Sequence, residues 1–247
     1  MSVTRVLLVG AKGRMGQIVQ SVAVSSADTR VTETVEIGEP IADRISNCDV
    51  VIDFSQADAI ESVLAACVSH GKPLVVGTTG HSTAQSEALD AAAEKVPVLV
   101  APNFSVGVNV LFWLTRKTAE LLGRDFDLEI VEAHHRLKKD SPSGTAKRLG
   151  QILCEVRALN YDEYVAHGRE GILGERGDNE IGMHAIRGGD IVGDHTVIFA
   201  GRGERLELTH KASSRETFAA GALRAARWIV AKPPGRYSME DVLSLQR

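Results

Sequence analysis

The chain has 247 residues, of which 44% are hydrophobic and 4% aromatic, so it can bury a large aliphatic core in one or two domains. Its net charge of −4 argues against nucleic acid as a partner, and its apolar runs are too short to span a membrane. The three cysteines are far apart and form no Cys-x-x-Cys motif, which favours reduced thiols in a cytoplasmic protein and assigns none of them a role.

The first hundred residues alternate between short apolar strands and helical patterns. We expect strands at 5–9, 31–36, 49–54, 73–76 and 97–101, and helices at 14–24, 57–70 and 82–95. Short strands separated by helices are typical of α/β proteins with a Rossmann-like, doubly wound parallel sheet. Ligands of such sheets bind beyond the carboxyl ends of the strands, where this chain is rich in Gly, Thr, Ser and Asn.

The first strand runs into a glycine turn followed by a helical pattern, the setting of a dinucleotide-binding fingerprint. Glycines stand at positions 10, 13 and 16, a spacing that ordinary strand–helix turns also show. Glu36 ends the second strand twenty residues after Gly16, where an acid commonly binds the adenosine ribose. Lys12 and Arg14 favour the extra phosphate of NADP, whereas Glu36 disfavours it, so we expect both NADH and NADPH to be used.

After Asn103 the pattern changes to that of a second, α+β unit with antiparallel strands. Its expected elements are a helix at 107–122, a strand at 127–134, a helix at 146–156 and extended segments at 181–187, 195–201 and 205–211.

Two helices, expected at 215–231 and 238–245, close the chain and should return to the first domain. We therefore expect a dinucleotide-binding domain over 1–105 that also takes in 216–247. The substrate-binding and oligomerisation domain should then cover 106–215.

The most informative segment runs from Glu132 to Ala146 and places two histidines and several cations before a Ser-Pro-Ser-Gly-Thr turn. The helix that follows begins with free N–H groups and the positive end of a dipole, which can hold a carboxylate or phosphate. His134 and Lys138 are candidate proton donors beside it. The pattern suggests a site that binds and protonates an acidic small molecule, with a solvated basic loop as the alternative.

We expect no metal site. Adjacent residues of a strand point to opposite faces, so His134 and His135 cannot simply chelate one ion. The other strand histidines, His184, His195 and His210, match no recognised metal-ligand spacing.

Further stretches carry a family resemblance: Val51–Ser55, Gly77–Gly80, Asn103–Asn109, Arg187–His195 and Leu208–Arg215. Together with the glycine turn and the segment Glu132–Ala146, they make the chain resemble the 4-hydroxy-tetrahydrodipicolinate reductase (dihydrodipicolinate reductase) family over nearly its whole length. The run that joins Glu-Ala-His-His-Arg to Pro-Ser-Gly-Thr-Ala is the specific part of this resemblance, whereas the glycine fingerprint is shared by many families.

The resemblance implies an oxidoreductase of lysine and diaminopimelate biosynthesis that reduces a small cyclic dicarboxylate with NADH or NADPH. It also implies a homotetramer joined through sheets of the substrate domain. His134 and Lys138 match the acid–base pair of the family, and His135, Gly144 and Thr145 match its substrate contacts. The matching cofactor contacts are Gly10, Ala11, Lys12, Gly13, Arg14, Met15, Glu36, Gly77, Thr78, Thr79, Ala101, Pro102, Asn103 and Phe104.

The chain departs from longer family members between Glu36 and Asn47, where ten residues make a shortened second strand–helix unit. The ribose contact by Glu36 is therefore the weakest of these assignments. Two other classes of protein share parts of the pattern. One is a different two-domain dehydrogenase of amino-acid metabolism, and the other is a protein that senses NAD(P) without turnover.

Overall fold

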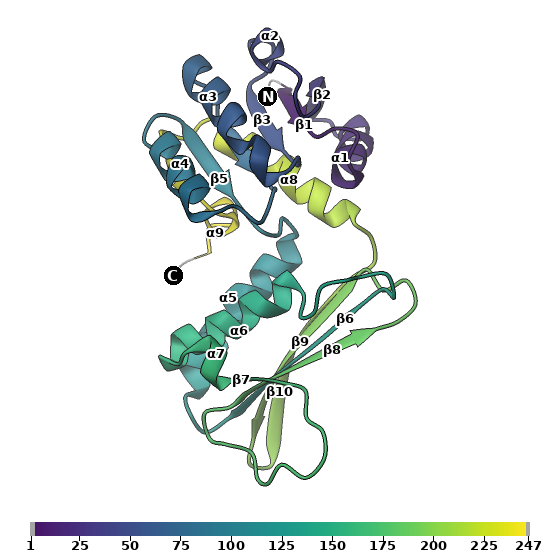
Figure 1. The fold of residues 1–247 in the computed structure, drawn as a ribbon, viewed down its shortest axis with the longest axis vertical. Helices are drawn as coiled ribbons and strands as arrows, with labels where there is room; N and C mark the ends of the chain where they lie inside the picture. The colour runs from purple at the N-terminus through teal and green to yellow at the C-terminus, as the bar shows by residue number, and fades with distance from the viewer. Residues whose placement is uncertain (1–2, 246–247) are drawn as a thin grey trace. The chain divides into compact units, whose positions relative to one another are not determined.

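The computed structural model describes residues 3–245 and contains two compact units (Figure 1). The first unit consists of Met1–Val106 with Arg215–Arg247, and the second consists of Gly107–Ser214. Within the described residues, no helix is both long enough and apolar enough to cross a membrane.

The first unit is built on a six-stranded, fully parallel sheet in the order β11-β5-β4-β3-β1-β2. Its strands are β1 (Thr4–Val9), β2 (Thr29–Val35), β3 (Val50–Asp53), β4 (Leu74–Val76), β5 (Pro97–Val100) and β11 (Gly235–Tyr237). The inner strands are runs of Val, Ile and Leu that are buried on both faces, as a covered parallel sheet requires. The predicted Rossmann-like sheet is thereby confirmed.

Helices cover both faces of this sheet. On one face, α1 (Arg14–Val24) and α8 (Glu216–Ile229) pack against alternate strand residues such as Leu8 and Ile52. On the other, α3 (Ile60–His70) and α4 (Thr83–Ala93) pack against the intervening residues. The remaining short helices are α2 (Ala42–Ile45), the 3₁₀ turn η1 (Ala57–Ala59) and α9 (Met239–Val242).

The second unit contains a five-stranded sheet in the order β10-β9-β6-β8-β7. Its strands are β6 (Asp127–His134), β7 (Val165–His167), β8 (Ile181–Arg187), β9 (Gly193–Gly201) and β10 (Glu204–Ala212), and its helices are α5 (Val106–Leu122), α6 (Gly144–Arg157) and α7 (Tyr161–Tyr164). Side chains of α5 and α6 form one core with the face of the sheet that carries Leu128 and Ile130.

The expectation of an antiparallel second sheet is partly wrong, because the sheet is mixed. β9 pairs antiparallel with β6 and β10, but β8 runs parallel to both β6 and β7. The chain passes from β6 through α6 before it reaches β7 and β8, and such a helical crossover returns a strand in the parallel direction.

Local signals set the ends of several helices. Ser82 and Gln85 form a reciprocal capping box at the start of α4. Ser143 accepts a hydrogen bond from the Ala146 N–H, so α6 begins at Gly144 and not at the expected Ala146.

Candidate active site

The glycine turn of the first unit joins β1 to α1 and is shaped by close backbone contacts. Gly10 has a φ of +80°, which favours glycine, and a Cβ there would lie 2.6 Å from the carbonyl oxygen of Phe54. A Cβ on Gly16 would lie 2.2 Å from the carbonyl oxygen of Gly10. Gly13 caps the start of α1, so the first-turn N–H groups of that helix face the turn. This geometry suits a bound pyrophosphate.

Glu36, the first residue after β2, is tied to the same turn. Its Oε1 accepts a hydrogen bond of 2.8 Å from the backbone N–H of Lys12. The side chains of Lys12 and Arg14 are exposed. The shortened segment after Glu36 therefore still leaves an acid beside the glycine turn.

A cavity of about 270 Å³ lies within the first unit at the carboxyl ends of its strands. Six of the predicted cofactor residues line it together with Phe54 and Phe218: Met15, Gly77, Thr79, Pro102, Asn103 and Phe104. The rings of Phe54 and Phe104 meet edge to face at 5.8 Å. Gly77 is required for this packing, because a Cβ there would overlap the Phe54 ring.

A buried carboxyl group, Asp53, connects the loops that border this cavity. One oxygen of Asp53 accepts from the N–H of Ser55 at 3.0 Å, and the other accepts from the hydroxyl of Thr78 at 2.9 Å. Burial raises the pKa of Asp53, although the hydrogen bonds from Ser55 and Thr78 act in the opposite direction. Thr78, a predicted cofactor contact, is thus buried and holds the loop in place.

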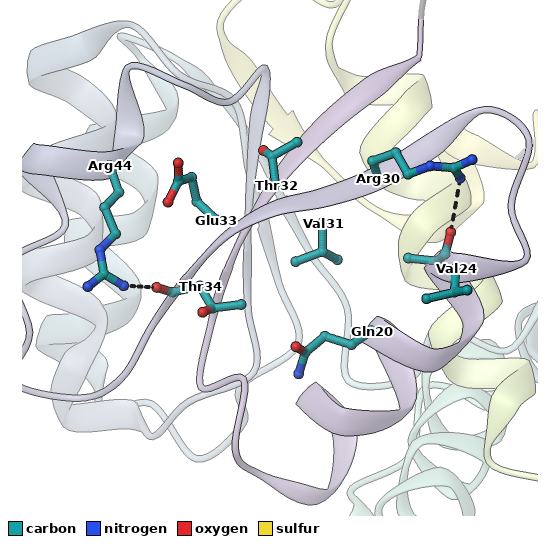
Figure 2. Close-up of a pocket in the computed structure, with 9 residues that line it drawn as sticks. Gln20, Val24, Arg30, Val31, Thr32, Glu33, Thr34 and Arg44 are labelled. Atoms are coloured by element: carbon teal, nitrogen blue, oxygen red, sulfur yellow. Dashed lines mark hydrogen bonds between the residues drawn. The ribbon is translucent and has the colours of Figure 1, made fainter.

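A second cavity of the first unit, of about 300 Å³, runs along the outer strand β2 (Figure 2). At its two ends, Arg44 donates to the carbonyl oxygen of Thr34 and Arg30 donates to that of Ala23 at 3.3 Å. Arg44 therefore occupies a carbonyl of the edge strand β2, whereas Arg30 binds a carbonyl at the end of α1. None of the predicted site residues lines this cavity.

In the second unit, the end of β6 brings ionisable side chains into the buried face of the sheet. The strand is buried at every second residue, and Glu132 and His134 share a face with Leu128 and Ile130. Nδ1 of His134 lies 2.7 Å from Oε2 of Glu132. The guanidinium of Arg187, at the end of the neighbouring β8, donates to both oxygens of Glu132 at 2.8 Å.

The backbone N–H of Ser143 completes the surroundings of Glu132 with a hydrogen bond of 3.0 Å. Burial opposes the charge of Glu132, but the hydrogen bonds from His134, Arg187 and Ser143 outweigh it and lower its pKa to about 2. Glu132 is therefore a fully buried carboxylate with a donor on every side.

His195 of β9 lies against this cluster. Its ring meets that of His134 edge to face at 5.2 Å, and its Nε2 lies 2.9 Å from the hydroxyl oxygen of Ser143. Burial, with the neighbouring His134, lowers the pKa of His195 to about 3, so its ring is neutral near pH 7.

The predicted proton donor Lys138 lies in the loop between β6 and α6. Its ammonium pairs with Asp140 at 2.9 Å, and the backbone oxygen of Asp140 accepts from Arg187 at 2.8 Å. The charge of Lys138 makes a small contribution to the lowered pKa of His195, after burial and the neighbouring His134. Gly144 and Thr145 form the first turn of α6.

His134 thus ends β6, Lys138 lies in the loop from β6 to α6, and Gly144 and Thr145 begin α6. His135 is the first residue after β6 and is half-buried. The sequence reasoning did not single out Glu132, Arg187, Ser143 and His195 as functional. The alternation along β6 was the available signal, since it places Glu132 on the same face as two buried aliphatic residues. Among the described residues, no group of three His, Cys, Asp or Glu side chains is arranged to hold a metal ion.

Two family models together match most of the chain. The model described as dihydrodipicolinate reductase, N-terminus, matches residues 4–104, and the one described as dihydrodipicolinate reductase, C-terminus, matches residues 107–243. A relative from Akkermansia muciniphila named 4-hydroxy-tetrahydrodipicolinate reductase is 52% identical over 98% of both chains. A relative of the same name from Hahella chejuensis is 45% identical and covers 98% of this chain and 100% of its own.

The fold is also similar to that of a solved structure. Dipicolinate-bound dihydrodipicolinate reductase from Paenisporosarcina sp. TG-14 superposes with a TM-score of 0.78 at 23% sequence identity, covering 96% of this chain and 97% of that one.

Proposed function

Since the chain belongs to the dihydrodipicolinate reductase family, we propose that it catalyses the NADH- or NADPH-dependent reduction of 4-hydroxy-tetrahydrodipicolinate to tetrahydrodipicolinate. The reaction belongs to lysine and diaminopimelate biosynthesis. Water is lost from the ring as the 4-hydroxyl group and a hydrogen of a neighbouring ring carbon, and a hydride and a proton are added to the ring. The observation that carries the proposal is the Glu132–His134 pair beside the start of α6. The pair provides a proton donor in a fixed position, and the start of the helix suits an anion.

His134 and Lys138 are the proposed catalytic residues, with Lys138 the donor of the proton to the ring. The side chain of Lys138 is 20% exposed and its ammonium is bound to Asp140, so the residue is available to a ligand without being fully solvated. His135, Gly144 and Thr145 are the proposed substrate contacts. The first-turn amides of α6 and the positive end of its dipole suit a carboxylate of the substrate.

The nicotinamide cofactor supplies the hydride when it is bound. The proposed cofactor contacts are the glycine turn (Gly10, Ala11, Lys12, Gly13, Arg14 and Met15), Glu36, and the strand-end residues Gly77, Thr78, Thr79, Ala101, Pro102, Asn103 and Phe104. The tight turn of the first unit and the cavity lined by Phe54 and Phe104 support this assignment. The proposed cofactor choice is relaxed, since Glu36 and the pair Lys12 and Arg14 have opposite effects on a 2′-phosphate.

We further propose a cytoplasmic homotetramer, joined through the sheets of the second unit, that acts on a small molecule and not on nucleic acid or a membrane. One observation supports the assembly. α5 and α6 pack on the face of the sheet that carries Leu128, whereas Val131, Ile186 and Ile198 lie on the opposite face, and Ile186 is 52% exposed. Apolar side chains on an open sheet face are typical of a protein–protein contact.

A steady-state assay tests the activity. NADPH absorbance should fall when the substrate, generated enzymatically, is added to the protein. A protein that only senses the cofactor would bind NADPH without this fall. Pyridine-2,6-dicarboxylate should compete with the substrate and not with NADH, and competition against NADH alone would contradict the anion site at Gly144 and Thr145.

A further inference from the structure

Two clusters of similar composition, each a glutamate bound by a histidine and by arginine, lie on opposite faces of β6. On the buried face, Glu132 binds Arg187 and Nδ1 of His134. On the other face, Glu129 binds two arginines, Arg169 and Arg176, and Nε2 of His184 at 2.8 Å. The pKa of each glutamate is about 2, because hydrogen bonds from its histidine and its arginine partners outweigh the effect of burial. The two clusters differ in what they contain: the Glu132 cluster includes a proposed catalytic residue, His134, whereas the Glu129 cluster includes none.

The charge of Glu132 decides where the proton of His134 resides. An ionised carboxylate accepts hydrogen bonds and donates none, so the 2.7 Å contact requires a proton on Nδ1 of His134. In the neutral ring Nε2 is then the acceptor, and in the charged ring it carries the proton that can be transferred. A carboxylate in this position also stabilises the charged ring.

Arg187 keeps the carboxylate of Glu132 ionised and fixes its position. A carboxylate removed from water without a counter-charge is strongly destabilised, and both oxygens of Glu132 are bound by the Arg187 guanidinium. The same guanidinium donates to the backbone oxygen of Asp140, whose side chain holds Lys138. Arg187 therefore supports both proposed proton donors from one position.

The remaining groups around His134 leave Nε2 as its reactive atom. From β6, β8, β9 and the loop before α6, the charged or titratable groups that act here are Glu132, Arg187, the neutral His195 and Lys138, with His210 of β10 next to His195. Gly193 faces Nε2 itself, since a Cβ on Gly193 would lie 3.0 Å from that atom. A residue with a side chain at position 193 would therefore press against the imidazole rings of His134 and His195.

We propose that Glu132 and Arg187 are positioning residues: Arg187 holds Glu132 as a carboxylate, and Glu132 fixes the proton of His134 on Nδ1 so that Nε2 exchanges protons during the reaction. This inference rests on the proposed function, because it concerns how His134 acts in that reduction. Neither residue needs to touch the substrate.

The parent protein by itself provides the first test. In a ¹H–¹⁵N spectrum of its histidine side chains, the signal of His134, assigned by its loss in His134→Gln, should show a protonated Nδ1. A spectrum with the proton of the neutral ring on Nε2 would overturn the proposal. This measurement needs no activity, so it separates the proposal from the proposed function, which fails if the parent protein does not oxidise NADPH with the substrate.

The second test compares Glu132→Gln with Glu129→Gln and Glu132→Asp. Glu132→Gln should lower kcat by up to ~10²–10⁴-fold, the contribution of a general acid, with a much smaller change in KM. The alkaline limb of its kcat/KM profile should also lie at lower pH than that of the parent, because the Glu132 carboxylate no longer stabilises the charged form of the His134 ring. Glu132→Asp keeps the charge and should keep the parent pH profile. Glu129→Gln removes an equivalent carboxylate from the other face and should leave the profile where it is.

Two outcomes of this comparison contradict the proposal. One is an alkaline limb of the Glu132→Gln profile that coincides with that of the parent. The other is an equal shift in Glu129→Gln, which would show a general effect of charge on the unit. Arg187→Lys provides the second variant if Glu132→Gln does not fold. A lysine cannot bind both oxygens of Glu132, so the same shift with a smaller loss of kcat is expected, and an unshifted profile would again overturn the proposal.

Discussion

The first unit offers its proposed cofactor contacts largely as backbone and small side chains at the ends of β1, β4 and β5, whereas the second offers charged side chains at the end of β6. In the first, Gly10, Gly16 and Gly77 are needed because other atoms occupy the space of a Cβ. In the second, Glu132 is needed because it is the centre of four hydrogen bonds. The first site is therefore sensitive to volume and the second to charge.

Each unit also buries one carboxyl group completely, and the two respond to burial in opposite ways. Asp53 of the first unit has neutral donors, Ser55 and Thr78, and burial raises its pKa. Glu132 of the second unit has Arg187 and His134 as donors, and its pKa is lowered to about 2. At Asp53 the neutral hydrogen bonds do not compensate for the loss of water around the charge, whereas at Glu132 the hydrogen bonds from His134 and the bidentate guanidinium do.

The largest expected effect separates chemistry in the second unit from cofactor binding in the first. Lys138→Ala should lower turnover by ~10²–10⁴-fold, the usual contribution of a general acid, and leave the affinity for NADH unchanged. Lys139→Ala removes the neighbouring exposed lysine and serves as the control. Turnover of Lys138→Ala within a few-fold of the parent would exclude Lys138 from the mechanism.

A change of volume in the glycine turn should act on stability and cofactor binding together. In Gly16→Ala the new Cβ meets the backbone of Gly10 and Ala11, which cannot move like a side chain, so a destabilisation of about 1–3 kcal/mol or more is expected. Urea unfolding and NADH titration measure the two effects. Gly177→Ala, where a Cβ meets nothing within 4 Å, is the control, and equal stabilities of the two variants would contradict the steric argument.

The two buried carboxyl groups predict opposite dependences of stability on pH. The folded-state pKa of Glu132 lies below that of the unfolded chain, so its contribution, on the order of 3 kcal/mol, is present above about pH 4.5 and is lost as the pH falls towards 2. Glu132→Gln should thus be more destabilising at pH 7 than at pH 3. Because the pKa of Asp53 is raised, Asp53→Asn should instead be less destabilising at pH 7 than at pH 3.

Unfolding of both variants at the two pH values measures this difference. The same dependence for Glu132→Gln and Asp53→Asn would show that their partners do not distinguish the two carboxyl groups.

The smallest effect concerns charge within the first unit, whose site otherwise depends on volume. Lys12→Ala keeps the backbone N–H that binds Glu36 and removes only an exposed ammonium. It should therefore lower the affinity for NADPH by a few-fold, about 1 kcal/mol or less, relative to the affinity for NADH. The difference should shrink as salt is added. Equal weakening of both cofactors would mean that Lys12 acts on the shared pyrophosphate.

The parts of the fold that the sequence predicts well are those with a strong local pattern. The apolar strands β1, β3 and β5 and the glycine turn carry that pattern, and they were expected at nearly their observed bounds. β7 and β11 are three residues long and depend on pairing with β8 and β5, so no local pattern marks them. The direction of β8 depends in turn on the crossover through α6.

The same limit applies to the site. His134 and Lys138 stand out in a sequence because they are reactive residue types in a basic loop. Arg187 comes within 2.8 Å of Glu132 through the pairing of β6 with β8, 55 residues apart in the chain, and such a contact has no local signature. Phe218 reaches the cavity of the first unit from α8, after the whole second unit has intervened.

That intervening position of the second unit has a consequence for synthesis on the ribosome. α8 supplies Ala222 and Leu223 to the core that covers Leu8 and Ile52. The strands β1 to β5 are complete once Val100 is made, but their α8 face stays uncovered until residues 216–229 emerge. At ~5–20 residues per second this interval lasts roughly 5–25 seconds. During it the part of the apolar sheet face that α8 later covers stays exposed on the nascent chain, while the second unit is being synthesised.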